Sequence, residues 1–304
     1  MSRRGLRLAA AAAAGVAGAL ASRCEASPPP SASLSAAPSA SLLSRVVALE
    51  HALLRPPPLP RLIVICPTFY PRLDDARCQL GLESCRRAKA LGIPLLLVDA
   101  SPPEVREALA EAGAEVREQS RKGKKGTALR ECVELALAMV PDDGIICYQE
   151  LEKVEMIALQ REVCGHMLRS GADICVPRRE DSLFRRSYPV EQWHSENFAN
   201  LYLDALGSAV GLPTLDWTFG PVAFRATMAH HWLRCEGELW DAQIVPYINA
   251  AIEGARVEGV QVSYSHPAQM KREEESLPVW SEKRLMQLDF LFKYVAEPLK
   301  ARAQ

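Results

Sequence analysis

The sequence predicts an α/β fold with an open, mostly parallel twisted sheet and helices on both of its faces. Apolar runs of strand length, rich in Val, Ile and Leu, recur along residues 62–179, as expected of strands buried on both faces of a parallel sheet. Segments with helical spacing of apolar residues separate these runs, and the alternation implies right-handed crossovers. The chain has 304 residues, 48% of them hydrophobic, and a formal net charge of -1, which gives no support to nucleic-acid binding.

The predicted elements follow one another in regular alternation. The first strand, "RLIVICPTF", is stopped by Pro67, and the second, "IPLLLVDAS", ends at Asp99. Ser101 and the prolines after it open the next helix, which Gly113 closes. In chain order we expect a strand at 61–69, a helix at 77–91, a strand at 93–101, a helix at 102–113, a strand at 114–119, a helix at 126–140, a strand at 144–150, a helix at 154–170 and a strand at 172–179.

The N-terminal part of the chain is typical of a targeting segment followed by a linker. Residues 1–24 contain no acid, and arginines precede an Ala-rich apolar run that is short for a membrane span. We therefore expect residues 1–26 to be a signal peptide or signal anchor for the secretory pathway and Golgi, or a transit peptide for a plastid or mitochondrion; a leader without an address is the alternative. Membrane attachment is expected only through such an anchor. Residues 27–60 form a Pro/Ser/Ala linker with a short helix at 41–54, and the folded domain is expected over 61–304.

Cysteine usage and the C-terminal tail fit a single folded domain. The nine cysteines show neither zinc-site spacing nor the density of a disulfide scaffold, and Cys66, Cys147 and Cys175 lie in apolar runs. We expect them to be buried small hydrophobes in a reducing compartment. The tail, 271–304, predicts a charged turn and one final amphipathic helix that docks on the domain.

Polar and charged residues gather where the predicted strands end. The carboxyl ends of parallel strands lie at one edge of a sheet, and ligands bind there. The residues concerned are Pro67, Thr68, Tyr70 and Arg72 after the first strand, Asp99 and Ser101 after the second, "SRKGKKG" (120–126) after the third, and Glu150, Glu152 and Lys153 after the fourth. Hydroxyls, acids and cations in this combination suit a nucleoside diphosphate.

Each group at this edge has a functional and a structural interpretation. Asp99 can accept hydrogen bonds from a base or ribose, or it can cap the next helix. The basic loop can bind phosphate through its cations and the backbone N–H groups of Gly123 and Gly126, or it can be a solvated turn. Glu150 and Glu152 can hold Mg²⁺ or Mn²⁺ beside a phosphate, or they can be acids at a helix start. No GxGxxG follows the first strand and no GxxxxGK[ST] occurs, so neither a Rossmann nor a P-loop site is predicted.

These segments together resemble the GT-A-fold glycosyltransferases, the nucleotide-diphospho-sugar transferases that include glycosyltransferase family 2. "CPTFYPR" resembles their opening strand, "LLLVDAS" their second strand with its terminal Asp, and "GKKGTALRECVELA" their Gly-rich turn and helix. "IICYQELEK" falls where the family carries its Asp-x-Asp metal motif. Downstream, "DWTFGPVAFRATM" resembles the segment lining the sugar pocket, and "GELWDAQIVPYINAAIEGARVEGVQVSYSHP" resembles an acid, a helix and a strand that ends in a metal-binding His. The resemblance covers residues 62–270.

The resemblance implies transfer of a sugar from a nucleotide diphosphate sugar to an acceptor hydroxyl, with a divalent metal, Mn²⁺ or Mg²⁺. The nucleotide and its phosphates would be bound by Pro67, Thr68, Tyr70, Arg72, Asp99, Lys124, Lys125 and Lys153. The metal ligands would be Glu150, Glu152 and His266, and Asp241 would be the catalytic base. The acceptor and sugar pocket would be formed by Trp193, Asp216, Trp217, Gly220 and Trp240.

Departures from the family pattern leave alternatives open. Glutamates replace aspartates in the metal motif, and Gln149 lies where the first acid is expected. Lys153 can itself bind a phosphate oxygen, which would make a metal unnecessary. Asp241 can instead cap its helix, His266 can be structural, and Trp193 can cover the core. At the level of function, the alternatives are a sugar nucleotidyltransferase, which would need a Gly-rich loop after the first strand, and a non-catalytic nucleotide-sugar-binding or scaffold protein.

Overall fold

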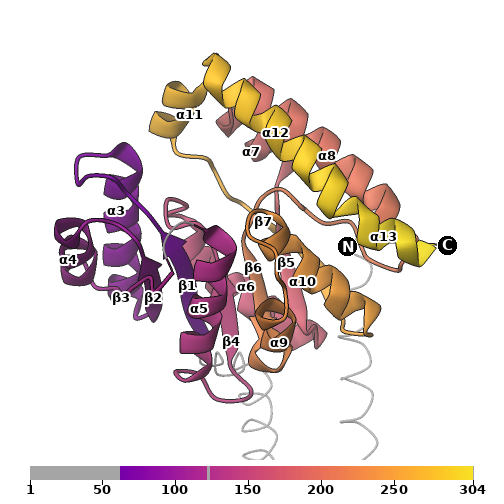
Figure 1. The fold of residues 1–304 in the computed structure, drawn as a ribbon, viewed down its shortest axis with the longest axis horizontal. Helices are drawn as coiled ribbons and strands as arrows, with labels where there is room; N and C mark the ends of the chain where they lie inside the picture. The colour runs from indigo at the N-terminus through magenta and orange to yellow at the C-terminus, as the bar shows by residue number, and fades with distance from the viewer. Residues whose placement is uncertain (1–61, 122–123, 304) are drawn as a thin grey trace, which may run out of the picture. The chain divides into compact units, whose positions relative to one another are not determined.

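A computed structural model describes residues 62–121 and 124–303, and it contains a seven-stranded sheet in the order β3-β2-β1-β4-β6-β5-β7 (Figure 1). The strands are β1 (Leu62–Thr68), β2 (Leu95–Asp99), β3 (Glu115–Glu118), β4 (Ile145–Tyr148), β5 (Ile174–Arg179), β6 (Val222–Arg225) and β7 (Val257–Val262). Only β6 runs antiparallel to its neighbours, β4 and β5. The prediction of an open, mostly parallel sheet is confirmed. The predicted targeting segment, the linker and the helix at 41–54 lie outside the described residues.

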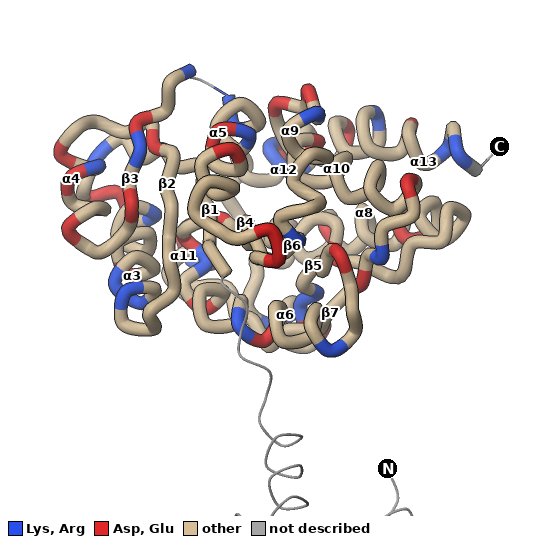
Figure 2. The backbone as a smooth tube through the Cα atoms, turned by 90° about the horizontal axis from the view of Figure 1, so that it is seen from below, with Lys and Arg blue, Asp and Glu red and all other residues tan. Residues whose placement is uncertain are grey.

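Two hydrophobic cores cover the two faces of the sheet. Alternate residues of a strand point to opposite faces, so Val64 and Cys66 of β1 enter one core while Ile63 and Ile65 enter the other. The first core includes residues of α3 (Ala76–Leu91), α4 (Pro103–Glu111), α6 (Met156–Ser170) and α7 (Asp181–Ser187). The second includes residues of α5 (Lys125–Leu137), α9 (Ala229–Leu233) and α10 (Asp241–Ile252). A 3₁₀ turn, η1 (Ala226–Met228), precedes α9. In Figure 2, β1 and β4 carry no charged residue, as this double burial requires.

The start of α3 is fixed by a cap. The carboxylate of Asp75 accepts hydrogen bonds from the backbone N–H groups of Arg77 and Cys78, at 2.8 and 3.3 Å. The helix ends at Gly92, whose φ of 63° is the left-handed conformation that glycine adopts without strain. The cap holds the first turn of α3, and with it Arg77, at the carboxyl edge of the sheet.

The C-terminal part of the chain forms a layer of helices beside the sheet. Figure 1 shows α8 (Val190–Ser208) alongside α12 (Pro278–Tyr294) and α13 (Ala296–Ala303), and the Phe292 ring of α12 contacts the rings of Phe198 and Tyr202 in α8. The predicted single helix is therefore two, because Pro298 lacks the N–H that would continue α12. The predicted charged turn is itself a helix, α11 (Ala268–Glu274).

The structure also describes the state of the cysteines and the apolar character of the helices. The eight cysteines within the described residues are all free and buried, as predicted. None of the helices over 62–121 and 124–303 combines the length and apolar character needed to cross a bilayer.

Candidate active site

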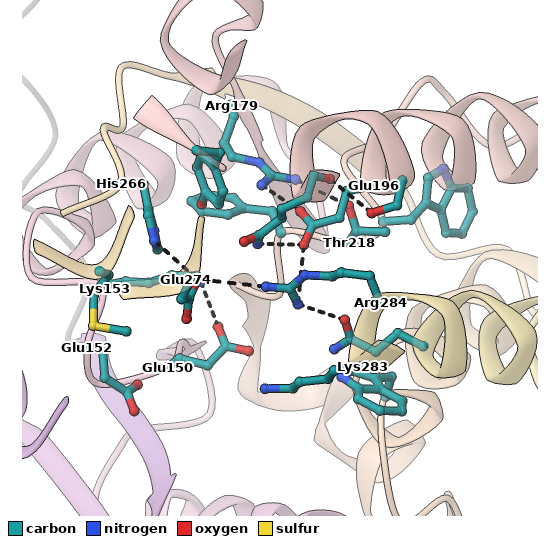
Figure 3. A pocket seen from close by; sticks show the side chains of 18 of the residues that line it. Glu150, Glu152, Lys153, Arg179, Glu196, Thr218, His266, Glu274, Lys283 and Arg284 are labelled. Atoms are coloured by element: carbon teal, nitrogen blue, oxygen red, sulfur yellow. Dashed lines mark hydrogen bonds and ion pairs between the residues drawn. The ribbon is translucent and has the colours of Figure 1, made fainter. Parts of the chain in front are cut away.

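Two hollows open at the carboxyl edge of the sheet. The first, which we call the β1–β2 hollow, has a volume of about 550 Å³ and is lined by Pro67, Thr68, Phe69, Ala100, Gln119, Lys124, Lys125 and Ala128. The second, which we call the charged cavity, has a volume of about 260 Å³ and lies between the end of β4 and helices α8, α11 and α12 (Figure 3). Lys125 lines both. A ligand that spans the two hollows must therefore pass its side chain.

The structure divides the predicted nucleotide-binding residues into three groups. Pro67, Thr68, Lys124 and Lys125 line the β1–β2 hollow, and Lys153 lines the charged cavity. Tyr70, Arg72 and Asp99 line neither hollow. Tyr70 is buried, and Arg72 is exposed and paired with Asp74 at 2.9 Å.

Asp99 is buried and engaged within the protein. Its carboxylate accepts hydrogen bonds from the Thr68 hydroxyl at 2.6 Å and from the Ser101 N–H and hydroxyl at 2.7 and 2.9 Å. Asp99 thus ties the ends of β1 and β2 together and orients Thr68 at the rim. The helix after it, α4, begins at Pro103 with no side-chain cap.

The Gly126 N–H, which was one of the candidate phosphate donors, is already hydrogen-bonded within the protein. Glu238 accepts a hydrogen bond from the Gly126 N–H through its carbonyl, at 3.1 Å, and from the Thr127 N–H through its carboxylate, at 3.0 Å. Arg130 also pairs with that carboxylate. The close approach requires glycine, because a Cβ on Gly126 would lie 2.0 Å from the Gly237 carbonyl oxygen. The protein's own acid therefore takes the anion position at this helix start.

At the end of β4, one carboxylate holds two ammonium groups. Glu150 Oε1 lies 3.3 Å from Lys125 Nζ, and Glu150 Oε2 lies 3.5 Å from Lys153 Nζ. We call these three residues the Glu150 trio. Burial opposes the ionisation of Glu150, but Lys153 and Lys125 outweigh it and lower the pKa of the carboxyl to about 2. Burial likewise opposes the charge of Lys153, yet Glu150 raises the pKa of its ammonium above the ordinary value.

Gly220 makes room for the Glu150 trio. Its φ of 100° is a conformation that favours glycine, and a Cβ at this position would lie 2.6 Å from Glu150 Oε2.

Among the other predicted pocket residues, Trp217 and Trp240 line the charged cavity. Trp193 does not; it packs against the core, and the Arg185 guanidinium lies 5.2 Å from its ring centroid.

Asp216 supports the cavity wall through Arg179, which sequence reasoning did not identify. Asp216 is buried and hydrogen-bonded, and its carboxylate accepts hydrogen bonds from Arg179 Nε and Nη2, both at 2.7 Å. Arg179 Nη1 donates to Glu196 Oε2 at 2.8 Å. Burial alone would raise the pKa of Asp216, but the Arg179 guanidinium holds it below its ordinary value. Asp216 and Glu196 therefore hold Arg179, the last residue of β5, as a positive charge in a fixed position at the cavity.

The opposite wall carries charges from α3, α11 and α12 that sequence reasoning did not assign to the site. Arg77 Nη2 donates to Glu274 Oε1 at 2.7 Å, and Arg284 Nη2 lies 4.0 Å from Glu274 Oε2. Lys283, beside Arg284 in Figure 3, has no ion pair with any described carboxylate. Burial, reinforced by Arg77, Arg284 and Lys125, lowers the pKa of Lys283 to about 8. We call Arg77, Glu274, Lys283 and Arg284 the α12 cluster. The charge run "KREEES" was its only sequence signal.

Comparison with known proteins rests on structure, since no family model and no curated protein matches the sequence. Glucosyl-3-phosphoglycerate synthase from Mycobacterium tuberculosis, in complex with Mn²⁺, UDP and phosphoglyceric acid, is similar with a TM-score of 0.50 at 12% identity, over 88% of this chain and 84% of that chain. Another structure of that enzyme gives a TM-score of 0.51 at 14% identity, over 80% and 81% of the two chains. A third, with Mn²⁺, UDP-glucose and phosphoglyceric acid, gives 0.50 at 13% identity, over 88% and 86%. The chain has the GT-A fold.

The GT-A fold raises the question whether the residues present suit a divalent metal. Within the described part of the chain, the one group of three His, Cys, Asp or Glu residues whose ligand atoms all lie within 4.8 Å of one another is His230, His231 and Glu253. The predicted ligands Glu150, Glu152 and His266 do not form such a group. Glu150 is already neutralised by lysines. The residues at the end of β4 therefore do not fit a metal site in this arrangement.

His266 lines the charged cavity and contacts Tyr188 and Glu274 there. Its ring stacks on the Tyr188 ring, with centroids 4.4 Å apart, and its Nε2 lies 3.7 Å from Glu274 Oε2. Burial lowers the pKa of His266, so the imidazole is neutral near pH 7.

Asp241, the predicted catalytic base, does not line the cavity. Its Oδ1 accepts hydrogen bonds from the N–H groups of Leu239 and Ala242 at the start of α10.

Proposed function

We propose that this protein is a glycosyltransferase that moves a sugar from a nucleoside diphosphate sugar to an acceptor. One observation carries the proposal: buried polar atoms that have no hydrogen-bond partner among the described residues converge on the charged cavity. Buried polar groups are nearly always hydrogen-bonded, so a group of unpaired ones around a cavity indicates a polar ligand. The atoms that also have no ion-pair partner are Tyr188 Oη, Gln192 Oε1, Tyr264 Oη, His266 Nδ1 and Arg284 Nε.

The arrangement of the two hollows supports a nucleotide sugar as donor. The β1–β2 hollow offers the apolar groups of Pro67 and Ala128, the Phe69 ring, which is 65% exposed, and the polar side chains of Thr68 and Gln119. Such a mixture suits a nucleoside, whose base stacks while its ribose needs hydrogen bonds. The diphosphate would then lie at Lys125, and the sugar would enter the charged cavity. The GT-A enzyme compared above binds UDP and UDP-glucose, so we take these as the first probes.

The α12 cluster supports an acceptor that carries a phosphate or carboxylate. Lys283 is a partly buried ammonium crowded by Arg77 and Arg284, and an anion beside it would relieve this like-charge repulsion. Arginine forks also suit the oxygens of phosphate and carboxylate groups. The phosphoglyceric acid bound by the compared enzyme is an acceptor probe of this class.

The decisive experiment follows transfer directly. The full chain is incubated with UDP-, GDP- and CDP-sugars and phosphoglyceric acid, with Mn²⁺ or with EDTA, and nucleoside diphosphate and glycosylated product are measured. We expect product with at least one donor, and its loss in Arg284→Ala, with Arg302→Ala on the exposed C-terminal helix as the control. Binding of a nucleotide sugar without turnover would favour the non-catalytic alternative, and formation of a nucleotide sugar from a sugar phosphate and a nucleoside triphosphate would favour the nucleotidyltransferase.

We also propose that residues 1–26 direct the protein to the secretory pathway or to an organelle, on the basis of their basic, acid-free and Ala-rich composition. Imaging of the full chain with a C-terminal fluorescent tag, against a chain that begins at residue 27, tests this. Equal distributions of the two would contradict it.

A further inference from the structure

Only part of the segment after β4 faces the charged cavity. Gln149 and Leu151 are buried, at 0% and 1% exposure, and do not line it. The Gln149 amide group accepts a hydrogen bond from Gln160 at 3.0 Å and donates to the Lys153 carbonyl at 3.3 Å. The cavity-facing residues of the segment are thus Glu150, Glu152 and Lys153, two acids and a cation.

Lys125 and Lys153 reach Glu150 from different directions. Lys125 is the first residue of α5, and Lys153 lies three residues beyond Glu150 in the turn after β4. Aromatic faces adjoin both ammonium groups: Lys125 Nζ lies 5.7 Å from the Tyr148 ring centroid and Lys153 Nζ lies 5.3 Å from that of Phe219. The two lysines outweigh the single carboxylate, so the Glu150 trio keeps a net positive charge.

We propose that the Glu150 trio takes the place of a divalent metal, with Lys125 and Lys153 binding the donor diphosphate and Glu150 holding both ammonium groups in position. The inference rests on the proposed glycosyl transfer and states which residues supply the positive charge that the donor diphosphate requires. Lys125 lies where the two hollows meet, which is where a donor spanning them places its diphosphate. An ammonium group binds phosphate oxygen directly and needs no carboxylate ligands other than the one that orients it.

The transfer step balances without a metal. The bond between the anomeric carbon and the β-phosphate oxygen breaks, and its electron pair stays on that oxygen as the nucleoside diphosphate departs. The acceptor oxygen forms the new bond to the anomeric carbon, and its proton is released to solvent water. The two ammonium groups stabilise the negative charge that develops on the leaving diphosphate.

The test measures UDP and UDP-glucose binding to the full chain by calorimetry, after dialysis against EDTA and again with Mn²⁺ or Mg²⁺. We expect dissociation constants that agree within about twofold, and transfer that persists in EDTA. Binding that appears only with a metal ion, or tightens at least tenfold with it, would overturn the inference and leave the proposed glycosyl transfer standing. Absence of binding by UDP-, GDP- and CDP-sugars in both conditions would overturn both.

Variants of Lys125 and Lys153 test which residue supplies the positive charge that binds UDP. Lys125→Met and Lys153→Met keep the length of the side chain and remove the ammonium group, and each should weaken UDP binding in EDTA about tenfold, which corresponds to about 1.4 kcal/mol. Lys153→Arg should retain most of the affinity. Lys300→Met, at an exposed position on α13, is the control for the loss of one positive charge. If Lys153→Met folds with an unchanged melting temperature and binds UDP as the wild type does, the inference is wrong for that residue, and the EDTA measurement still decides the rest.

Discussion

Arg179 and Asp216 form a bidentate ion pair in the wall of the charged cavity, with both nitrogen–oxygen distances at 2.7 Å. The Arg179 side chain is 1% exposed, and its guanidinium also lies 3.5 Å from the centroid of the Phe184 ring. Removing one partner of such a pair leaves a buried charge without compensation. The first prediction therefore concerns the free energy of unfolding when this pair is broken.

Asp216→Asn should lower the free energy of unfolding by about 3–5 kcal/mol, because Arg179 then keeps only Glu196 as a charged partner. Urea denaturation of the two proteins measures the difference. Asp74→Asn is the matched control, since Asp74 pairs with Arg72 at the surface, where such a pair contributes about 0–1 kcal/mol. Equal losses in the two variants would show that burial does not set the strength of the Arg179 pair.

Gly220→Ala should reduce nucleotide affinity as well as stability. The positive φ costs about 1–3 kcal/mol for a residue with a side chain, and the new Cβ would push against Glu150 and so displace the lysines that Glu150 holds. Gly211→Ala is the control, because Gly211 has a φ of 82° and a Cβ added there would meet no atom within 4 Å, so that only strain is added. Calorimetry with UDP should separate the two; equal affinities would contradict the role given to Gly220.

The binding of an anionic acceptor should weaken as the pH rises through 8. Lys283 carries its charge below a pKa of about 8 and loses it above, so affinity for phosphoglyceric acid should be constant near pH 7 and fall about tenfold by pH 9. The phosphate, with a second pKa of about 6, is already mostly ionised at pH 7, so its own titration cannot account for a loss of affinity as the pH rises. Lys283→Arg keeps a positive charge throughout and should bind equally well at both pH values. A wild-type profile that matches that of Lys283→Arg would remove Lys283 from the acceptor site.

Asp241→Ala should separate the two roles that the sequence allowed for this residue. The carboxylate accepts backbone hydrogen bonds from Leu239 and Ala242, so its loss should lower the free energy of unfolding by about 0.5–1.5 kcal/mol, as for a typical hydrogen bond. The turnover number should stay within about twofold of the wild type, because Asp241 does not line the cavity. A loss of about 10²–10⁴-fold in kcat would instead identify it as the general base.

The sheet could be predicted from the sequence because its strands are local signals. The segments that form β1, β2 and β4 are runs of buried apolar residues in which neighbouring side chains serve opposite cores. Parallel neighbours of this kind require crossover connections, which are helices here. The antiparallel strand β6 is different. It is four residues long, and its direction depends on pairing with β4 and β5 rather than on its own pattern.

The residues of the site also fall into those that local sequence signals predict and those that depend on tertiary packing. Thr68, Lys125, Glu150 and Lys153 follow strands and helix starts, so their convergence could be foreseen from the sheet alone. Lys283 and Arg284 stand on a helix whose place depends on packing between distant segments, such as the contact of Phe292 with α8. Their sequence neighbourhood is that of ordinary surface helices, and only the fold makes them neighbours of Glu150.

The position of Glu274, Lys283 and Arg284 late in the chain separates most of the α12 cluster from the β1–β2 hollow along the sequence. The β1–β2 hollow is built from residues 67–128, whereas Lys283 and Arg284 belong to a helix that begins at Pro278. Recognition of the two substrates can therefore diverge independently during evolution. An exchange of α11 and α12 between homologous proteins, with the buried residues Leu291 and Val295 retained, is a direct route to chimaeras with a new acceptor and the original donor.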